Sequence, residues 1–135
     1  MNVTRAAPGW QRRQSGYALV ELALATPLLL VVLVATIEFA WWGHAQNVVT
    51  AAVQDGARIA SAQDGSLDRG VGIAEALLHD GLGPSATLVT VQPSEDQDAV
   101  TLEARGRWPL LSGAGVEWSL PLGARARIQR ERWRP

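Results

Sequence analysis

Gly16, Tyr17 and Glu21 are the residues of this sequence whose types and spacing could do chemistry. Glu21 stands at the start of a strongly apolar run, where a carboxylate costs up to about 2–3 kcal/mol in a membrane unless it is partnered. Residues i and i+4 share one helix face, so a positive charge at residue 17 could neutralise Glu21. Cutting the chain after Gly16 would create that charge, because it leaves an ammonium group on Tyr17.

The residues around this position resemble a prepilin signal. A short basic leader, residues 1–16, ends in Gly16; an aromatic residue, Tyr17, would then open the mature chain, with Glu21 as its fifth residue. A glycine at the cut suits a peptidase that must bind an extended backbone without obstruction by a side chain. The resemblance implies cleavage after Gly16 by a prepilin peptidase. The alternative is an uncleaved chain in which this spacing is a coincidence.

Two segments within residues 12–60 resemble the TadE/TadG-like family of pseudopilins. Residues 15–30 carry the family's glycine, its Val-Glu pair, its proline and the Leu/Val run that follows. The second segment is the signature that follows the membrane helix in that family, here Ala51, Ala52, Gly56, Ala57 and Arg58. Leu22 departs from the pattern, because the family usually has an aromatic residue after the glutamate. This departure and the long C-terminal part point away from a major pilin.

The resemblance implies a minor pseudopilin of a tight-adherence (Tad, Flp) type IV pilus system, which helps to initiate or assemble the pilus at the bacterial inner membrane. The implied partners are a prepilin peptidase, other pilins or pseudopilins, inner-membrane pilus assembly proteins and the lipid bilayer. Entry into the pilus itself stays open. Two alternatives remain: an uncleaved bitopic membrane protein whose outer domain binds envelope partners, and a minor pseudopilin of type II secretion.

Composition argues against most other chemistry. The chain has no cysteine, which excludes disulfide scaffolds and thiol nucleophiles, and no lysine, which excludes a phosphate-binding Gly-Lys-Ser/Thr loop. A net charge of −1 argues against a generic nucleic-acid binder. The sequence around Glu95, Asp96 and Asp98 lacks the twelve-residue pattern of a calcium-binding loop. It therefore predicts a solvated acidic turn. We therefore expect no catalysis, metal, cofactor, nucleic acid or small-molecule substrate.

Hydrophobic residues concentrate in the segment that must position Glu21. They fill 21 of the 26 positions in residues 17–42, against 43 of the other 109. As a helix this segment would be about 39 Å long, enough to cross a hydrocarbon core of about 30 Å with some tilt. Upstream arginines without acidic residues predict a cytoplasmic N-terminus. A single-pass protein with its C-terminal domain outside the cytoplasm follows, with Trp41 and Trp42 at the outer interface.

Pro27 interrupts the hydrogen bonding of this helix. Proline has no backbone N–H and crowds the carbonyl of Ala23, so it predicts a kink or a loosened turn. The hydroxyl of Thr26 is available for a compensating hydrogen bond. The kink could aid movement from bilayer to filament, or it could be passive.

Periodicity predicts an α+β fold for the whole chain: a long N-terminal membrane-spanning helix continuing into a stalk, a short helix and a small antiparallel sheet of about three strands. The predicted second helix is 67–80, stopped by Gly81, and the predicted strands are 86–91, 100–105 and 116–128. The expected domains are a leader (1–16), a transmembrane helix (17–42), a helical stalk (43–61) and a small outer domain (62–135).

Prolines, tryptophans and arginines give three further predictions for the outer domain. Pro93 should end the first strand, and Pro121 marks the third as an edge strand or a break. Trp108 and Trp118 are predicted to lie in the core or on a sheet face. The arginines near the C-terminus predict a solvated strand edge and tail, or a contact with an acidic partner; they are Arg125, Arg127, Arg130, Arg132 and Arg134.

Overall fold

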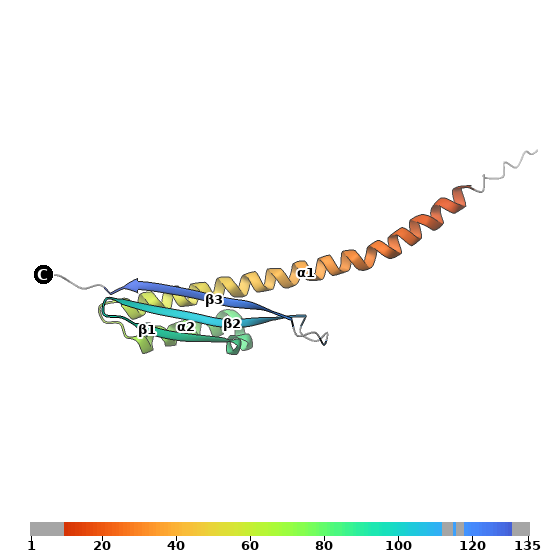
Figure 1. Cartoon of the computed structure of the whole chain (residues 1–135). Helices are drawn as coiled ribbons and strands as arrows, with labels where there is room; N and C mark the ends of the chain where they lie inside the picture. The colour runs from red at the N-terminus through yellow and green to blue at the C-terminus, as the bar shows by residue number, and fades with distance from the viewer. Residues whose placement is uncertain (1–9, 112–114, 116–117, 131–135) are drawn as a thin grey trace, which may run out of the picture. The chain divides into compact units, whose positions relative to one another are not determined.

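The computed structural model describes the backbone of residues 10–111, 115 and 118–130, with side chains from residue 16 onward. The elements are α1 (Trp10–Ser61), α2 (Leu67–Leu82), the 3-10 helix η1 (Gly83–Leu88), β1 (Val89–Glu95), β2 (Ala99–Leu110) and β3 (Trp118–Gln129). The predicted α+β class is confirmed, with a long apolar N-terminal helix, a short helix and three antiparallel strands in the order β1-β2-β3 (Figure 1).

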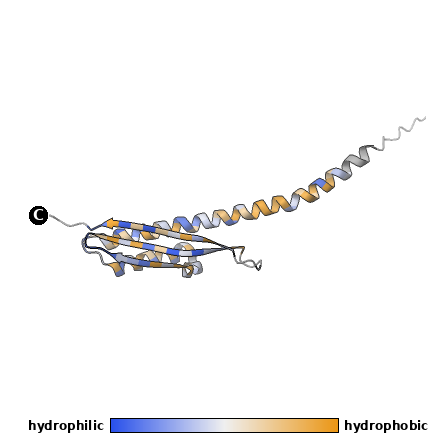
Figure 2. Ribbon diagram, viewed as in Figure 1, coloured by the Kyte–Doolittle hydropathy of each residue, from blue (hydrophilic) through white to orange (hydrophobic). Residues whose placement is uncertain are grey.

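Two compact units make up the chain, Met1–Ile37 and Glu38–Pro135. The first contains the apolar part of α1, which Figure 2 shows as a nearly continuous hydrophobic stretch. The second contains the rest of α1, α2 and the sheet. Residues 1–9, most of the predicted leader, lie outside the described residues.

The core of the second unit lies between the helices and one face of the sheet (Figure 1). Alternate residues of β2 and β3 are buried, as expected when one sheet face is covered. The buried cluster comprises Ala45, Val49, Ala52, Val53 and Ala57 of α1, Leu78 of α2, Leu102 and Ala104 of β2, and Leu122 and Ala126 of β3. Small residues dominate the α1 contribution, so the helix backbone can approach the sheet closely.

The two helices approach each other closely at a pair of glycines, Gly56 of α1 and Gly70 of α2. A Cβ atom added to Gly56 would lie 2.6 Å from the carbonyl oxygen of Gly70 and 2.9 Å from Cβ of Ala74. A Cβ added to Gly70 would lie 2.6 Å from Cβ of Ala60. Neither position has room for a side chain, so glycine at both positions permits this helix packing.

Side chains of α1 bond to the open edge of β3. Nε1 of Trp42 donates to the carbonyl of Pro121 at 3.1 Å. Gln46 bonds Gly123 twice, since its Nε2 donates to the carbonyl at 2.6 Å and its Oε1 accepts from the backbone N–H at 3.3 Å. The backbone groups of these two residues therefore face away from β2, and the N–H that Pro121 lacks costs no bond in the sheet.

Gln46→Ala is expected to lower the stability of the second unit by about 1 kcal/mol, because two partly solvated hydrogen bonds to β3 are lost. The midpoint of thermal unfolding, followed by near-UV circular dichroism in detergent, should fall by about 4–8 °C. Asn47→Ala, at an exposed position on the same helix, should leave the midpoint nearly unchanged. Equal effects of the two variants would contradict a specific role for the Gln46–Gly123 bonds.

The second helix ends later than predicted. Ser66 caps its start, accepting a hydrogen bond from the N–H of Arg69. The helix runs through Gly81, which packs against Val48, and ends at Leu82. Gly83 is the stop, since its φ of +56° is a left-handed value that glycine adopts without steric cost. The prediction that Gly81 ends the helix was therefore wrong.

The first strand is also displaced along the chain. Residues 86–88, predicted as strand, belong to η1, where Pro84 sits in the first turn and Thr87 donates to its carbonyl at 3.0 Å. Strand β1 then continues through Pro93 to Glu95 rather than stopping at the proline. Strand β1 is an edge strand, where a missing N–H is tolerated, so the prediction of a stop was wrong.

The third strand confirms one of the two alternatives for Pro121. Strand β3 is the other edge of the sheet and passes through Pro121 without a break. It begins at Trp118, and Val116 lies outside the described residues.

Candidate processing and assembly site

Gly16, Tyr17 and Glu21 all lie on α1. Tyr17 and Glu21 are one helical turn apart on the same face, and both are exposed, Tyr17 by 80%. A Cβ added to Gly16 would have no neighbouring atom within 4 Å. In the uncut chain the nitrogen of Tyr17 is a peptide nitrogen, so it offers Glu21 no positive charge. Gly16 is helical here, so a peptidase that needs an extended backbone must unwind this turn.

The surface around Glu21 is almost wholly apolar. Large hydrophobic side chains on every face of this part of α1 are exposed, among them Leu19, Leu24, Leu28 and Val31. Within the described part of the chain, one helix, near the N-terminus, is long and apolar enough to cross a membrane. A helix that is hydrophobic on all faces requires a nonpolar surrounding, which a bilayer or neighbouring helices would supply.

Helix α1 continues through Pro27. The hydroxyl of Thr26 donates to the carbonyl of Leu22 at 2.7 Å. The carbonyl that Pro27 leaves without its usual donor is that of Ala23, four residues before it. The Thr26 bond therefore lies beside the interrupted position and does not replace the missing bond.

The predicted family signature divides into buried and exposed residues. Ala52, Gly56 and Ala57 are buried in the second unit, where Gly56 forms the close contact with α2. Ala51 and Arg58 are exposed on the other side of the helix. The three buried residues thus have a packing role.

Sequence reasoning missed a link between the acidic turn and the end of β3. Arg130 pairs with Glu95 at 2.5 Å, and Arg127 pairs with Asp96 at 3.5 Å. The backbone N–H of Arg130 also donates to the carbonyl of Asp98 at 2.9 Å. Two of the arginines predicted to be solvated or to meet an acidic partner therefore bind acidic residues of their own chain. Arg132 and Arg134 lie outside the described residues.

The two tryptophans of the sheet differ. Trp108 is half-buried against the core, as predicted. Trp118 lies on the sheet at the start of β3 but is 66% exposed, so it is not a core residue. Among residues 10–111, 115 and 118–130, no group of three or more His, Asp or Glu side chains could hold a metal ion.

The apolar part of α1 and the second unit together define a class of protein: a small α+β unit attached to an apolar helix that could span a membrane once. Residues 16–58 match the family model described as TadE-like protein. This match confirms the TadE-like resemblance and contains all of the residues proposed above for processing, assembly and the signature. Residues 59–135 lie outside it. Comparison with curated proteins finds no match, and comparison with solved structures finds none either.

Proposed function

We propose that this protein is a minor pseudopilin of a Tad pilus system that helps to initiate or assemble the pilus at the inner membrane. The single observation that carries the proposal is the TadE-like match, which begins at Gly16 and runs along the exposed apolar helix. The role is non-catalytic, and the chain acts through contacts with pilins or pseudopilins, assembly proteins and lipid.

In this proposal a prepilin peptidase cuts the precursor after Gly16 on the cytoplasmic side. The exposure of Tyr17 and the empty space around Gly16 support access to this bond. The new ammonium group on Tyr17 then lies one helical turn from Glu21 and offsets its charge, in the same chain or in a neighbouring one. The unit from Glu38 onward lies outside the cytoplasm.

N-terminal sequencing of the membrane-extracted protein tests the cleavage directly. The expected mature chain starts at Tyr17. A chain that starts at Met1 would favour the uncleaved bitopic protein, and one that starts beyond residue 40 would indicate removal of a secretory signal peptide. The neighbouring genes separate a Tad system from type II secretion.

Gly16→Val is expected to slow processing about 100-fold, because its branched side chain displaces the scissile bond from the peptidase. The fraction of mature protein, measured by immunoblot after a pulse of synthesis, should fall accordingly. Gly43→Val is the matched control, since the Cβ position of this second α1 glycine also has no atom within 4 Å. Normal processing of the Gly16 variant would contradict cleavage at this bond.

A further inference from the structure

The hydrogen bonds between α1 and β3 establish the direction in which β3 runs. From Trp42 to Gln46 the helix advances about 6 Å, and from Pro121 to Gly123 the strand advances about 6.6 Å. Trp42 binds Pro121 and Gln46 binds Gly123, so β3 runs in the same direction as α1. The start of β3 therefore lies at the end of the unit where the chain enters from the apolar part of α1.

This end of the unit carries exposed apolar side chains. Trp118, at the start of β3, lies about 10 Å before Pro121 along the strand. It is 66% exposed, and Leu111, just after β2, is 37% exposed. Leu110 is opposite Trp118 in the strand register. We call these three residues the hairpin-end patch.

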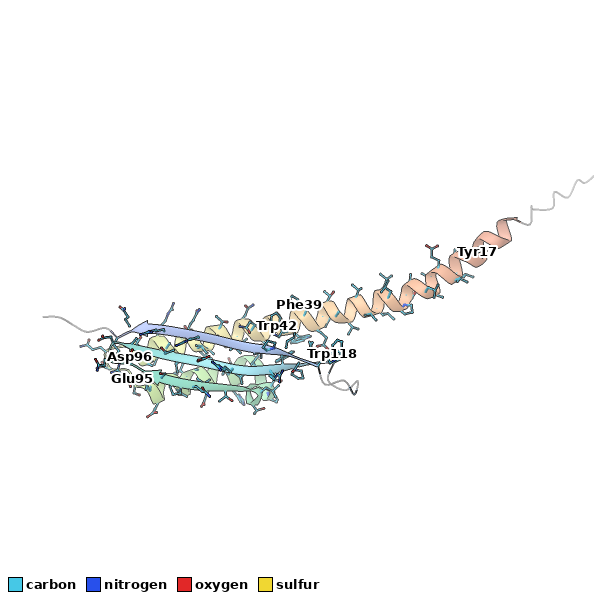
Figure 3. The ribbon with its side chains drawn as sticks, viewed as in Figure 1. Tyr17, Phe39, Trp42, Glu95, Asp96 and Trp118 are labelled. Carbon is cyan, nitrogen blue, oxygen red and sulfur yellow. The ribbon has the colours of Figure 1, made fainter. Side chains whose placement is uncertain are left out.

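Aromatic residues of α1 gather at the same end. Phe39 and Trp41 are 64% and 57% exposed, and the ring centroids of Phe39 and Trp42 are 5.3 Å apart. Figure 3 shows Phe39, Trp42 and Trp118 near one end of the sheet, with Glu95 and Asp96 at the other. Exposing several large aromatic rings to water at one end of a unit is unfavourable, whereas the headgroup level of a bilayer accommodates amphipathic rings.

We propose that the hairpin-end patch is a second membrane contact, in which Trp118 and Leu111 enter the headgroup region of the bilayer that α1 crosses. The inference rests on the membrane-spanning role proposed for α1. The chain enters this unit at Glu38 directly from the apolar helix, at the end of the unit that carries the patch. Arg107, exposed and opposite Pro121, places a cation near the same end, where it suits anionic lipid phosphates.

In this proposal the second contact would hold the second unit in one orientation on the bilayer. The apolar part of α1 alone would leave the chain free to rotate in the bilayer, since every face of this part is apolar and equally suited to lipid. With the hairpin-end patch on the bilayer, each copy would present the same side to its neighbours, which lowers the entropic cost of lateral assembly.

The absence of cysteine from the chain allows a direct test by site-directed spin labelling. The variants Trp118→Cys and Leu111→Cys would each carry a nitroxide, in the full chain, at low protein density in vesicles of phosphatidylethanolamine and phosphatidylglycerol. Collisions of the label with oxygen and with a water-soluble nickel complex report its depth. Leu28→Cys, within the apolar helix, and Gln129→Cys, at the far end of β3, are the controls.

Labels at 111 and 118 are expected to lose collisions with the nickel complex and gain collisions with oxygen relative to the label at 129. The Leu111 variant retains Trp118, so it tests the patch even if loss of the tryptophan weakens the contact. Water exposure at both 111 and 118, with Leu28 deep in lipid, would overturn the membrane contact while leaving the spanning helix intact. Water exposure at Leu28 would instead overturn the spanning helix itself. Protection that appears only at high protein density would identify a protein neighbour and overturn the lipid contact.

Discussion

Glu21→Ala is expected to abolish pilus assembly while leaving the protein in the membrane. The substitution removes the carboxylate that pairs with the ammonium group of Tyr17 in the proposed mature chain. A hydrogen bond to a charged group contributes about 1.5–3 kcal/mol, so the association constant of a subunit should fall about 10- to 150-fold. The apolar helix remains, and removing a charge favours membrane insertion further.

Pili sheared from cells and quantified by immunoblot measure this effect, and the mature fraction in the membrane separates assembly from processing. Glu21→Gln keeps the size of the side chain and removes its charge, so it should behave like the alanine variant. Glu38→Gln, at the other end of the apolar run, is the control and should assemble normally. Normal pili in the Glu21→Ala strain would favour the uncleaved bitopic alternative.

Gly56→Ala is expected to destabilise the second unit by about 1–3 kcal/mol. The new Cβ would lie 2.6 Å from a backbone oxygen of α2, which cannot move aside as a flexible side chain could. Helices α1 and α2 must therefore separate, which loosens the core beneath Leu102, a buried residue 3.0 Å from the same position. The loss exceeds the gain of up to about 1 kcal/mol that alanine brings to a helix in place of glycine.

Thermal unfolding followed by near-UV circular dichroism measures this destabilisation, because the signal reports side-chain packing. The midpoint should fall by about 10 °C. Gly72→Ala is the matched control in α2, since its Cβ would meet no atom within 4 Å; it should raise the midpoint slightly. A Gly56 variant that unfolds at or above the midpoint of the Gly72 variant would contradict the close helix contact.

The strand boundaries were predictable only in part. Alternating residues placed most of β3 but only the first half of β2, predicted as 100–105 and observed as Ala99–Leu110, because that period depends on neighbours in the chain. Pro93 and Pro121 were ambiguous, since a proline is tolerated or excluded according to which strand lies beside it. The paired arginines Arg127 and Arg130 carried no sequence indication of their partners, which lie across the sheet.

The sequence by itself determined the part of the protein that depends on local order: the basic N-terminal residues, Gly16, the four-residue spacing from Tyr17 to Glu21 and the apolar run. A helix repeats every few residues, so this spacing suffices to place groups on one face. The tertiary structure alone decided the Gly56–Gly70 contact, the α1 bonds to β3 and the exposed position of Trp118. These depend on residues far apart in the chain, such as Gln46 and Gly123, which are 77 positions apart and meet only after folding.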